Sequence, residues 1–438
     1  MDTDVVVVGA GAAGLAAALW LAEHSVRVAV LEGRNRIGGR VLWQPVGTSD
    51  VPAELGAEFI HGPAPETSAL LRDAGLTTRE TGGPTWLCRS AGVLETVEED
   101  FSSGDIFARV SSLAADESVD AFLRRFERDP QLREEARRAR SFVEGFEAAD
   151  PALASARAIA DEVRTGVDST SSRPAGSYAP LFAYLAARCT DTGIDLRLGT
   201  TVERIAWARG GVTVEARSEN TGAAAIHAKC AIVTVPVGVL QLGSGDAQIA
   251  FVPPLPPETQ AALRGLEMGH AVRVALTFRT PFWEDVAGGR YRDAAFFRCE
   301  GGAFNAFWTQ LPLRGRSIVA WAGGPRATAM NGTAMQDRID CACDEFGTMF
   351  GERERARREL EAGATHDWSA DPFAHGAYSY VATGGGAARA ALGVPVENRL
   401  FFAGEATATD GQAGTVSGAF GAGTRAAREA LLVITGVR

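Results

Sequence analysis

Residues 5–40 read VVVVGAGAAGLAAALWLAEHSVRVAVLEGRNRIGGR, and this stretch decides the fold class. Val5–Val8 form an apolar, β-branched run, which predicts a parallel strand buried on both faces. The alanine- and leucine-rich segment from residue 12 to about residue 23 predicts a helix, and residues 26–31 predict a second strand. This order of strand, helix and strand indicates a βαβ unit and an α/β fold.

Three glycines follow the first strand in the spacing G-x-G-x-x-G, at Gly9, Gly11 and Gly14. In a dinucleotide-binding unit, such glycines form the tight turn, admit a pyrophosphate to the backbone and let the helix pack against the sheet. The helix N-terminus supplies free N–H groups to the phosphates, and Glu32 can accept hydrogen bonds from ribose hydroxyls. The pattern predicts dinucleotide binding, with a glycine-rich turn in an ordinary βαβ unit as the alternative. Glu32 disfavours NADP but leaves NAD and FAD open.

The composition is typical of a globular protein with two domains. The chain has 438 residues, too many for one compact core, and 46% of them are hydrophobic and 22% are charged. A formal net charge of −11 argues against binding to nucleic acid or to an anionic membrane. No apolar run is long enough to span a bilayer, and the first residues do not resemble a signal peptide. We therefore expect a cytoplasmic protein with no nucleic-acid or membrane partner.

The cysteines do not predict a metal site. Six cysteines are scattered along the chain, and only Cys341 and Cys343 lie close together. Because no histidine or second cysteine pair stands at zinc-like spacing from them, we expect no metal. We interpret the cysteines as core residues or free thiols of a reducing compartment.

Three later regions define the organisation of the chain. Residues 105–162 are rich in Ala, Arg and Glu, with apolar residues at helical spacing, which predicts several helices outside the sheet domain. Residues 230–235 predict another buried parallel strand. Residues 400–403 predict a last strand, followed by a loop and a helix over about 415–434. This final unit suggests that the C-terminus closes the nucleotide-binding domain.

Five motifs in this order resemble the flavin-dependent amine oxidase family, which comprises monoamine oxidases, polyamine oxidases and lysine-specific histone demethylases. The motifs are ExRxRxGGR at 32–40, LGAEFIHG at 55–62, TVPVGVLQ at 234–241, WSADPFAHGAYSYV at 368–381, and LFFAGEAT followed by GTVSGAFGAGTRAA within 400–427. The resemblance covers the whole chain, and the pattern of site residues is most similar to that of polyamine oxidases.

The resemblance implies a Rossmann-type FAD-binding domain of the amine oxidase (GR2-like) fold, with a second α+β substrate-binding domain inserted in the sequence. It assigns residues 1–75, 190–280 and 395–438 to the first domain, and residues 76–189 and 281–394 to the second. The cofactor is then expected to be FAD. The residues expected to bind it are Gly9, Gly11, Ala13, Gly14, Glu32, Gly33, Arg34, Gly38, Gly39, Arg40, Gly56, Ala57, Glu58, Val202, Thr234, Trp368, Gly404, Glu405, Gly414, Thr415 and Val416.

The resemblance also implies a reaction. A neutral amine would transfer a hydride from its α-carbon to flavin N5, and the resulting imine would hydrolyse to an aldehyde. O2 would then reoxidise the flavin and yield H2O2. Burial in an aromatic-walled channel would favour the neutral amine over the ammonium ion. The expected partners are O2 and a small amine, either polyamine-like or another primary or secondary amine, and the expected assembly is a monomer or homodimer.

Tyr378 and Thr415 match the two walls of the family's aromatic cage. Tyr378 would form the wall that faces the flavin, with a core-packed tyrosine as the alternative. The second wall is tyrosine in monoamine oxidases, but polyamine oxidases and the demethylases have threonine, as here. Ala377 stands where monoamine oxidases carry the cysteine that bonds to the flavin, so we expect non-covalent FAD.

His61 and Arg273 are the other two candidates for catalysis. His61 matches a channel position where some polyamine oxidases place a histidine or glutamate, and it either holds a substrate nitrogen or hydroxyl or is structural. Arg273 stands where the family has a lysine that holds a water next to flavin N5 and assists reoxidation. Arginine offers a fixed positive charge but no neutral amine, so the oxygen half-reaction is open. Alternatively, the register differs and Arg273 is only a strand residue.

Alternative functions follow from the same motifs. An L-amino-acid oxidase shares the fold, but Phe59 occupies the position of the arginine that binds the substrate carboxylate in those enzymes. An amine dehydrogenase with poor O2 reactivity is the alternative that Arg273 raises. A chromatin-type demethylase would need docking helices and a basic surface, which we do not find. The non-enzyme alternative binds FAD without turnover. Phe296, Phe307 and Trp308 are candidates for the pocket lining or, equally, for the core.

Overall fold

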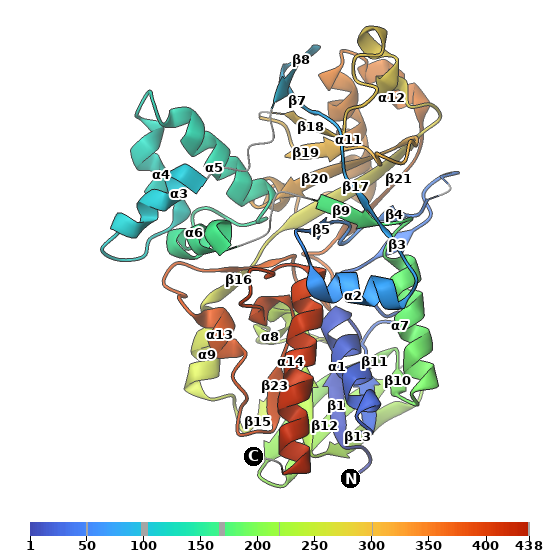
Figure 1. Cartoon of the computed structure of the whole chain (residues 1–438), viewed down its shortest axis with the longest axis vertical. Coiled ribbons are helices and arrows are strands. Elements are labelled where there is room, and N and C mark those ends of the chain that lie inside the picture. Colours follow the sequence, from blue (N-terminus) through green and yellow to red (C-terminus); the bar gives the residue numbers. More distant parts are fainter. Residues whose placement is uncertain (50, 98–103, 166–170, 219, 300, 437–438) are drawn as a thin grey trace.

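A five-stranded parallel sheet organises the lower half of the molecule in Figure 1. The computed structural model describes residues 1–49, 51–97, 104–165, 171–218, 220–299 and 301–436. The strand order is β10-β2-β1-β14-β23, with bounds Asp195–Arg197, Val28–Leu31, Val5–Val8, Cys230–Val233 and Leu400–Phe402. Every residue of the three central strands is buried, as expected for apolar parallel strands covered on both faces. The structure therefore confirms the predicted α/β fold and the return of the C-terminal segment to this sheet.

The two faces of this sheet are covered by different layers. Val5 and Val7 face helices α1, α2, α7 and α14, while Val6 and Val8 face a second, antiparallel sheet, because side chains alternate along a strand. The helices are α1 (Ala12–Glu23), α2 (Pro65–Asp73), α7 (Ala179–Asp191) and α14 (Val416–Thr435). The second sheet has the order β13-β12-β11-β15, with bounds Gly222–Ala228, Gly211–Ser218, Thr200–Ala208 and Ala250–Val252.

A seven-stranded sheet forms the upper half of the molecule in Figure 1. Its order is β21-β17-β20-β19-β18-β7-β8, with bounds Leu360–Asp367, Ala271–Phe278, Ser317–Gly323, Ala306–Trp308, Phe296–Cys299, Thr85–Ser90 and Val93–Val97. Helices α11 (Met335–Met349) and α12 (Arg353–Glu359) cover one face, over a core rich in phenylalanine and tryptophan.

Two elements lie outside the unit to which the sequence assigned them. β17 falls within the range expected for the cofactor domain, yet it pairs with β20 and β21 in the upper sheet. α7 falls mainly within the range expected for the substrate domain, yet it packs in the same core as α1. The buried apolar residues of each segment determine the core in which it packs. The order of segments along the chain does not reveal which core that is.

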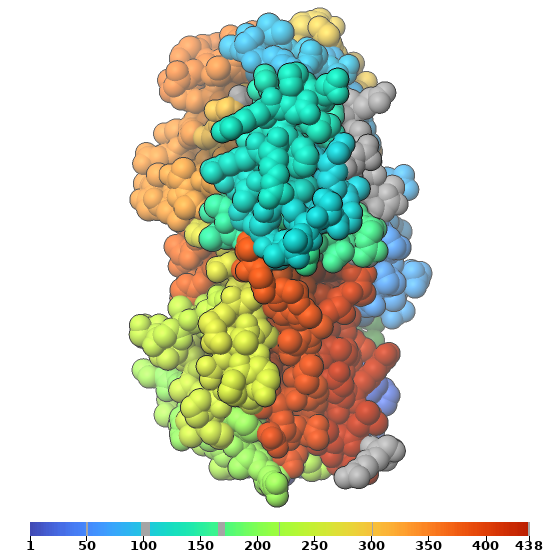
Figure 2. Space-filling model, turned by 90° about the vertical axis from the view of Figure 1, so that its left-hand side faces the viewer, coloured from blue at the N-terminus to red at the C-terminus, as the bar shows by residue number. Residues whose placement is uncertain are grey.

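The predicted helical region forms a separate group beside the upper sheet. Its helices are α3 (Gly104–Ala108), α4 (Val119–Glu127), α5 (Arg133–Gly145) and α6 (Ala156–Thr165). Figure 2 shows this group against the C-terminal part of the chain. There the backbone N–H of Ser155 donates to Val381 O at 3.0 Å, and that of Thr383 donates to Leu153 O at 2.8 Å. Within the described ranges, no helix has the length and apolar character that crossing a membrane requires.

Several short strands and helices lie outside the three large sheets and the helical group, and one of them, the strand that ends at His61, carries a predicted site residue. The strands are β3 (Trp43–Gln44) with β4 (Ala53–Glu54), β16 (Leu266–Met268) with β22 (Ser379–Val381), and β5 (Ile60–His61), β9 (Ser171–Pro174) and β6 (Thr78–Glu80) in that order. The helices are α8 (Val237–Leu240), α9 (Pro257–Arg264), α10 (Pro325–Thr328) and α13 (Ala388–Leu392).

A close approach between α14 and α1 depends on Gly423. A Cβ atom at this position would lie 2.1 Å from the carbonyl oxygen of Ala13, in the first turn of α1. No side chain can be accommodated at that distance without moving the backbone of one helix. The packing of the last helix against the first therefore requires glycine at this position.

We expect Gly423→Ala to lower the free energy of unfolding by about 1–3 kcal/mol, because the added methyl group forces α14 away from α1. Gly421→Ala is the matched control in the same helix, since its Cβ would meet Glu66 at an ordinary contact distance of 3.5 Å. The control should be neutral or slightly stabilising, because alanine favours helix over glycine. Urea denaturation of both variants measures the difference, and equal stabilities would contradict the packing argument.

Candidate active site

An elongated cleft of about 180 Å³ lies at the C-terminal ends of the parallel strands. Val8, Leu31, Thr234 and Gly404 line it, each at or just beyond the end of a strand. In open α/β sheets this is the edge at which nucleotides bind. All the residues that the sequence assigns to the cofactor line this cleft, except Gly14 and Glu58.

The glycines form a backbone cradle at one end of the cleft. Gly9 has φ +102°, and a Cβ on it would lie 2.7 Å from Thr234 Oγ1. A Cβ on Gly14 would lie 1.9 Å from the carbonyl oxygen of Gly9, so Gly14 serves helix packing rather than the cleft surface. Among the described residues, no side chain caps the N-terminus of α1. Its first N–H groups and its positive dipole end are therefore available to a diphosphate.

Glu32 is held rigidly at the end of β2. It is buried, its Oε2 accepts a hydrogen bond from Ala10 N at 2.8 Å, and its Oε1 accepts one from Arg34 N at 2.9 Å. Arg34 in turn forms an ion pair with Asp371, and its guanidinium lies 5.2 Å from the ring of Phe373. The carboxylate keeps lone pairs that can accept hydroxyl groups of a ribose.

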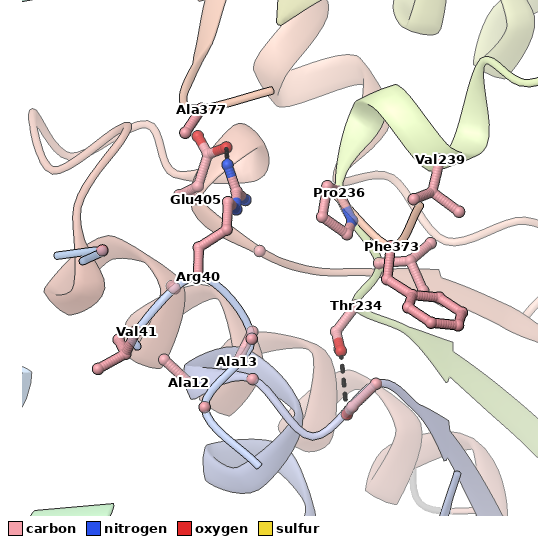
Figure 3. A pocket seen from close by; sticks show the side chains of 18 of the residues that line it. Ala12, Ala13, Arg40, Val41, Thr234, Pro236, Val239, Phe373, Ala377 and Glu405 are labelled. Carbon is pink, nitrogen blue, oxygen red and sulfur yellow. Dashed lines mark hydrogen bonds and ion pairs between the residues drawn. The ribbon is translucent and has the colours of Figure 1, made fainter. Parts of the chain in front are cut away.

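Arg40 and Glu405 form an ion pair of 2.9 Å in the cleft, although they lie near opposite ends of the chain. Figure 3 shows this pair on one side of the cleft and Phe373 and Val239 on the other. Ser379 donates to Glu405 Oε2 through its hydroxyl at 2.6 Å. Burial raises the pKa of Glu405, but the charges of Arg40 and Arg389 outweigh this effect and leave the pKa lowered. Glu405 is therefore a buried carboxylate that stays ionised.

A second cavity of about 1000 Å³ adjoins the cleft. Its walls come from the upper sheet, from the helical group and from the loop that precedes β5, and they include Phe59, Phe146, Phe296 and Trp308. The residues shared by the two spaces are Gly56, Ala57, Trp321, Tyr378, Gly414, Thr415 and Val416. A dinucleotide in the cleft and a small molecule in the cavity would meet at these residues.

Tyr378 stands at this junction against Gly414. A Cβ on Gly414 would lie 2.9 Å from Cδ2 of the tyrosine ring, so the contact requires glycine. Burial raises the pKa of the Tyr378 phenol, and the nearby carboxylates of Glu147 and Glu405 raise it further, so the ring stays neutral. Thr415 caps α14: its Oγ1 accepts from Gly418 N at 3.0 Å and donates to Gln412 O at 2.7 Å.

His61 lines the large cavity away from the nucleotide cleft. Its Nδ1 lies 2.9 Å from Ser171 Oγ, and its ring centroid lies 5.2 Å from that of Phe146. Burial lowers the pKa of His61 to about 4, so the imidazole is neutral at physiological pH. A neutral ring beside an aromatic wall can accept or donate a hydrogen bond but carries no charge that would repel a cation.

Arg273 and Glu58 form a buried ion pair in the wall of the same cavity. Arg273 also donates to Gly56 O at 2.6 Å, and its guanidinium lies 5.2 Å from the ring of Trp308. Burial lowers the pKa of Arg273 to about 9, which still leaves it charged at neutral pH. His270, on the other side of β17, lies 3.0 Å from Ser369 Oγ through its Nδ1 and takes no part in this pair.

Two carboxyl groups of the helical group reach the cavity close to Tyr378. Glu147 and Glu162 both line it, and Arg389 pairs with Glu162 at 3.1 Å. Burial raises the pKa of Glu147 to about 8, and the charge of Glu162 adds to the effect while Arg389 opposes it. This part of the cavity can take up a cation, which would displace the proton from Glu147.

The two spaces together fit a flavin dinucleotide and a substrate. The glycine cradle, the buried carboxylate of Glu32 and the pair of Arg40 with Glu405 lie along one cleft, and the aromatic cavity opens at its far end. A family model described as flavin containing amine oxidoreductase matches residues 12–431. The chain belongs to this family.

Curated relatives of this amine oxidoreductase include oxidases and demethylases. Polyamine oxidase 4 of Oryza sativa subsp. japonica is 28% identical over 97% of this chain and 88% of its own length. Lysine-specific histone demethylase 1 homolog 2 of Arabidopsis thaliana is 29% identical over 100% of this chain. This chain spans only 59% of the length of that demethylase.

Solved structures of two amine oxidases share the fold. Cyclohexylamine oxidase from Brevibacterium oxydans IH-35A has a TM-score of 0.80 at 20% identity, covering 100% of both chains. Wild-type putrescine oxidase bound to putrescine has a TM-score of 0.78 at 21% identity, covering 98% of this chain and 99% of that chain. Both likenesses confirm the amine oxidase fold that the motifs predicted.

Several residues of the amine oxidoreductase site are not among the predicted site residues: Phe373 lies within the motif at 368–381, whereas Arg173 and Glu147 lie outside all five motifs. Phe373 packs against Gly33, whose Cβ would lie 2.5 Å from the ring, and Arg173 and Glu147 line or support the cavity. Phe296 and Trp308 line the cavity, whereas Phe307 lies in the core with its ring 5.5 Å from that of Phe346. Because side chains alternate along a strand, Phe307 is expected on the opposite face of the sheet from Trp308. The alternation does not show which of the two faces lines the cavity.

We expect Glu32→Ala to weaken flavin binding by about tenfold or more, because hydrogen bonds to a buried charge are lost. Glu23→Ala, at the opposite end of α1, removes the same charge from the surface and serves as the control. Equilibrium dialysis of the flavin from both purified variants measures the effect. Equal dissociation constants would exclude a role for Glu32 in holding the nucleotide.

Proposed function

We propose that the protein binds FAD non-covalently and oxidises an amine, with O2 as acceptor and H2O2 as product. The observation that carries this proposal is the junction at Tyr378, Gly414 and Thr415, where the nucleotide cleft meets the aromatic cavity. Non-covalent binding is supported by Ala377, which lines the cleft beside Tyr378 and offers no nucleophile. The six cysteines are free thiols, which supports the proposed cytoplasmic location.

A bound flavin supplies the redox step, because it takes a hydride from the α-carbon of a neutral amine, leaves an imine for hydrolysis and passes two electrons to O2. The protein residues prepare the amine for this step. The aromatic wall of Tyr378, Phe59 and Trp308 favours the neutral amine over the ammonium ion, because burial disfavours charge. Neutral His61 would accept or donate a hydrogen bond to a second polar group of the substrate.

A polyamine-like substrate is favoured by the carboxyl groups of Glu147 and Glu162. They lie in the same cavity as Tyr378 and would attract a cationic nitrogen separate from the nitrogen that is oxidised. Other primary or secondary amines remain candidates, because the aromatic part of the cavity by itself suits an apolar amine. O2 is the proposed acceptor, and an amine dehydrogenase is the second candidate, since Arg273 stands where the family has lysine.

An L-amino-acid oxidase is less well supported. Phe59 stands at the position expected for an arginine, and the guanidinium of Arg173 lies 4.5 Å from its ring. Arg173 is engaged with Glu58 at 2.6 Å and donates to the carbonyl oxygens of Thr309 and Leu311. Each of its three nitrogens therefore already has a partner, and a bidentate contact with a substrate carboxylate would have to compete with these contacts.

An anaerobic titration of the purified flavoprotein with an amine panel tests the proposal. We expect polyamines or other amines to bleach the flavin, and subsequent admission of O2 to restore the absorbance and produce H2O2. An L-amino acid panel is the control for the alternative function. Reduction without reoxidation by O2 would support a dehydrogenase, and no reduction by any amine would contradict enzymatic amine oxidation.

We expect Tyr378→Ala to slow the anaerobic reduction of the flavin by about tenfold or more, because one aromatic wall beside the amine is removed. Tyr378→Phe keeps the ring and should retain a rate close to that of the unchanged protein. Stopped-flow absorbance measures both rates at saturating amine. An unchanged rate in the alanine variant would remove Tyr378 from the reacting face.

A further inference from the structure

Glu58 is the centre of a buried cluster of charges in the cavity wall. It is only 5% exposed, and it pairs with Arg273 on β17 and, at 2.6 Å, with Arg173 on β9. Trp308 Nε1 donates to its Oε2 at 3.1 Å. The carboxylate therefore joins the loop before β5 to three strands from two different sheets. The side chain lies outside the nucleotide cleft, although its neighbours Gly56 and Ala57 line it.

Arg273 is fixed in one place by its surroundings. The guanidinium donates to Gly56 O at 2.6 Å, pairs with Glu58 and lies over the ring of Trp308. Because Gly56 also lines the nucleotide cleft, this hydrogen bond places the cation beside the junction of the two spaces. A Cβ on Gly56 would lie 1.9 Å from Arg40 O, so this close approach of the two backbone segments requires glycine.

The charges around Glu58 nearly balance. Arg273 and Arg173 bring two positive charges, and Glu58 brings one negative charge. Glu54 faces the same cluster, and burial raises its pKa to about 7, opposed by the hydrogen bond from Tyr178 N and by the charge of Arg273. The cluster therefore has about one net positive charge when Glu54 is protonated and none when Glu54 is ionised.

We propose that Glu58 is a positioning residue that holds the Arg273 guanidinium against the Gly56 carbonyl and neutralises its charge at the junction. Arg273 then contributes a fixed donor to the site without the electrostatic effect of a free cation. As a consequence, the bound flavin has a lower reduction potential and a weaker affinity for anions than an unpaired Arg273 would give it.

The physical reason lies in the charge of the reduced state. A flavin that has accepted two electrons is anionic at neutral pH, and so is its complex with sulfite. A nearby positive charge stabilises both anions, and the low dielectric of a buried wall increases the effect. Removing the negative charge of Glu58 while keeping its shape should therefore raise the reduction potential and strengthen sulfite binding.

The decisive variant is Glu58→Gln, because the amide keeps the volume of the side chain and an oxygen for Trp308. We expect the dissociation constant for sulfite to fall about tenfold. The same stabilisation of the reduced anion changes the equilibrium constant of the two-electron couple about tenfold and raises the potential by about 30 mV. Sulfite binding is read from the visible absorbance of the bound flavin at pH 8, above the pKa of Glu54. The potential is measured with a reference dye.

Arg273→Met gives the opposite prediction, because Glu58 then loses one of its two cationic partners and keeps Arg173. We expect sulfite binding to weaken and the potential to fall. Shifts of opposite sign in the two variants support the proposal, whereas no shift, or shifts of the same sign, would overturn it. Glu134→Gln is the control: this exposed residue also lines the cavity, and its loss should leave the potential unchanged. A shift there as large as that of Glu58→Gln would overturn the assignment to Glu58.

A third variant allows the proposal to be tested even if Glu58→Gln does not fold. Glu58→Gln leaves two buried cations with less compensation, which can destabilise the protein. If it yields no folded flavoprotein, Glu58→Asp replaces it, since the shorter side chain keeps the charge but withdraws it from Arg273. A small rise in potential with Glu58→Asp and a fall with Arg273→Met support the proposal, and unchanged potentials in both refute it.

This inference rests on the proposed flavin cofactor but not on amine turnover. A protein that binds flavin and oxidises no amine would still give the sulfite and potential measurements. Failure of the amine titration and failure of this proposal are therefore distinguishable.

Discussion

The ion pair between Arg40 and Glu405 is the contact on which the arrangement of the site depends. It joins a residue that follows the first βαβ unit to one that follows the last strand of the same sheet, at 2.9 Å. The pair forms only because β23 adds to the parallel sheet and α14 packs against α1 through Gly423. Both ends of the chain thereby form one cleft, and a buried carboxylate in that cleft has a compensating cation. A nucleotide site assembled in this way cannot exist in either half of the sequence alone.

The second half of the site depends on how the upper sheet and the helical group are placed over this cleft. Tyr378 and Gly414 meet at the point where the two spaces join, and the contact allows no side chain on the glycine. The cavity walls combine strands of the upper sheet with the helical group, which is tied to the rest by backbone hydrogen bonds at residues 153–155 and 381–383. A substrate therefore lies between segments that are far apart in the sequence. Which substrates the cavity can bind depends on the polar groups that these segments place among its aromatic side chains.

Two clusters of charged groups in the cavity wall contain compensating charges. Glu58 lies between Arg273 and Arg173, and Glu162 pairs with Arg389. Such pairing is what a low-dielectric interior requires, because an uncompensated charge would be strongly destabilising. Arg273 is thus accompanied by the carboxylate of Glu58, which pairs with it. As an arginine, it offers a cation but not the proton chemistry of an amine.

The sequence by itself determined the parallel sheet, the glycine cradle, Glu32 and the family. These features are local: the apolar run Val5–Val8, the spacing of Gly9, Gly11 and Gly14, and the short motifs around Glu405 report on their own backbone and require no partner to be recognised. Only the tertiary structure decided that β17 belongs to the upper sheet, that Phe307 is core while Phe296 and Trp308 line the cavity, and that Glu58 pairs with Arg173 and Arg273. These outcomes depend on contacts between residues that are far apart in the sequence or on which face of a strand is buried. Periodicity and motif spacing describe one segment at a time, so they carry no information about which distant segment will face it.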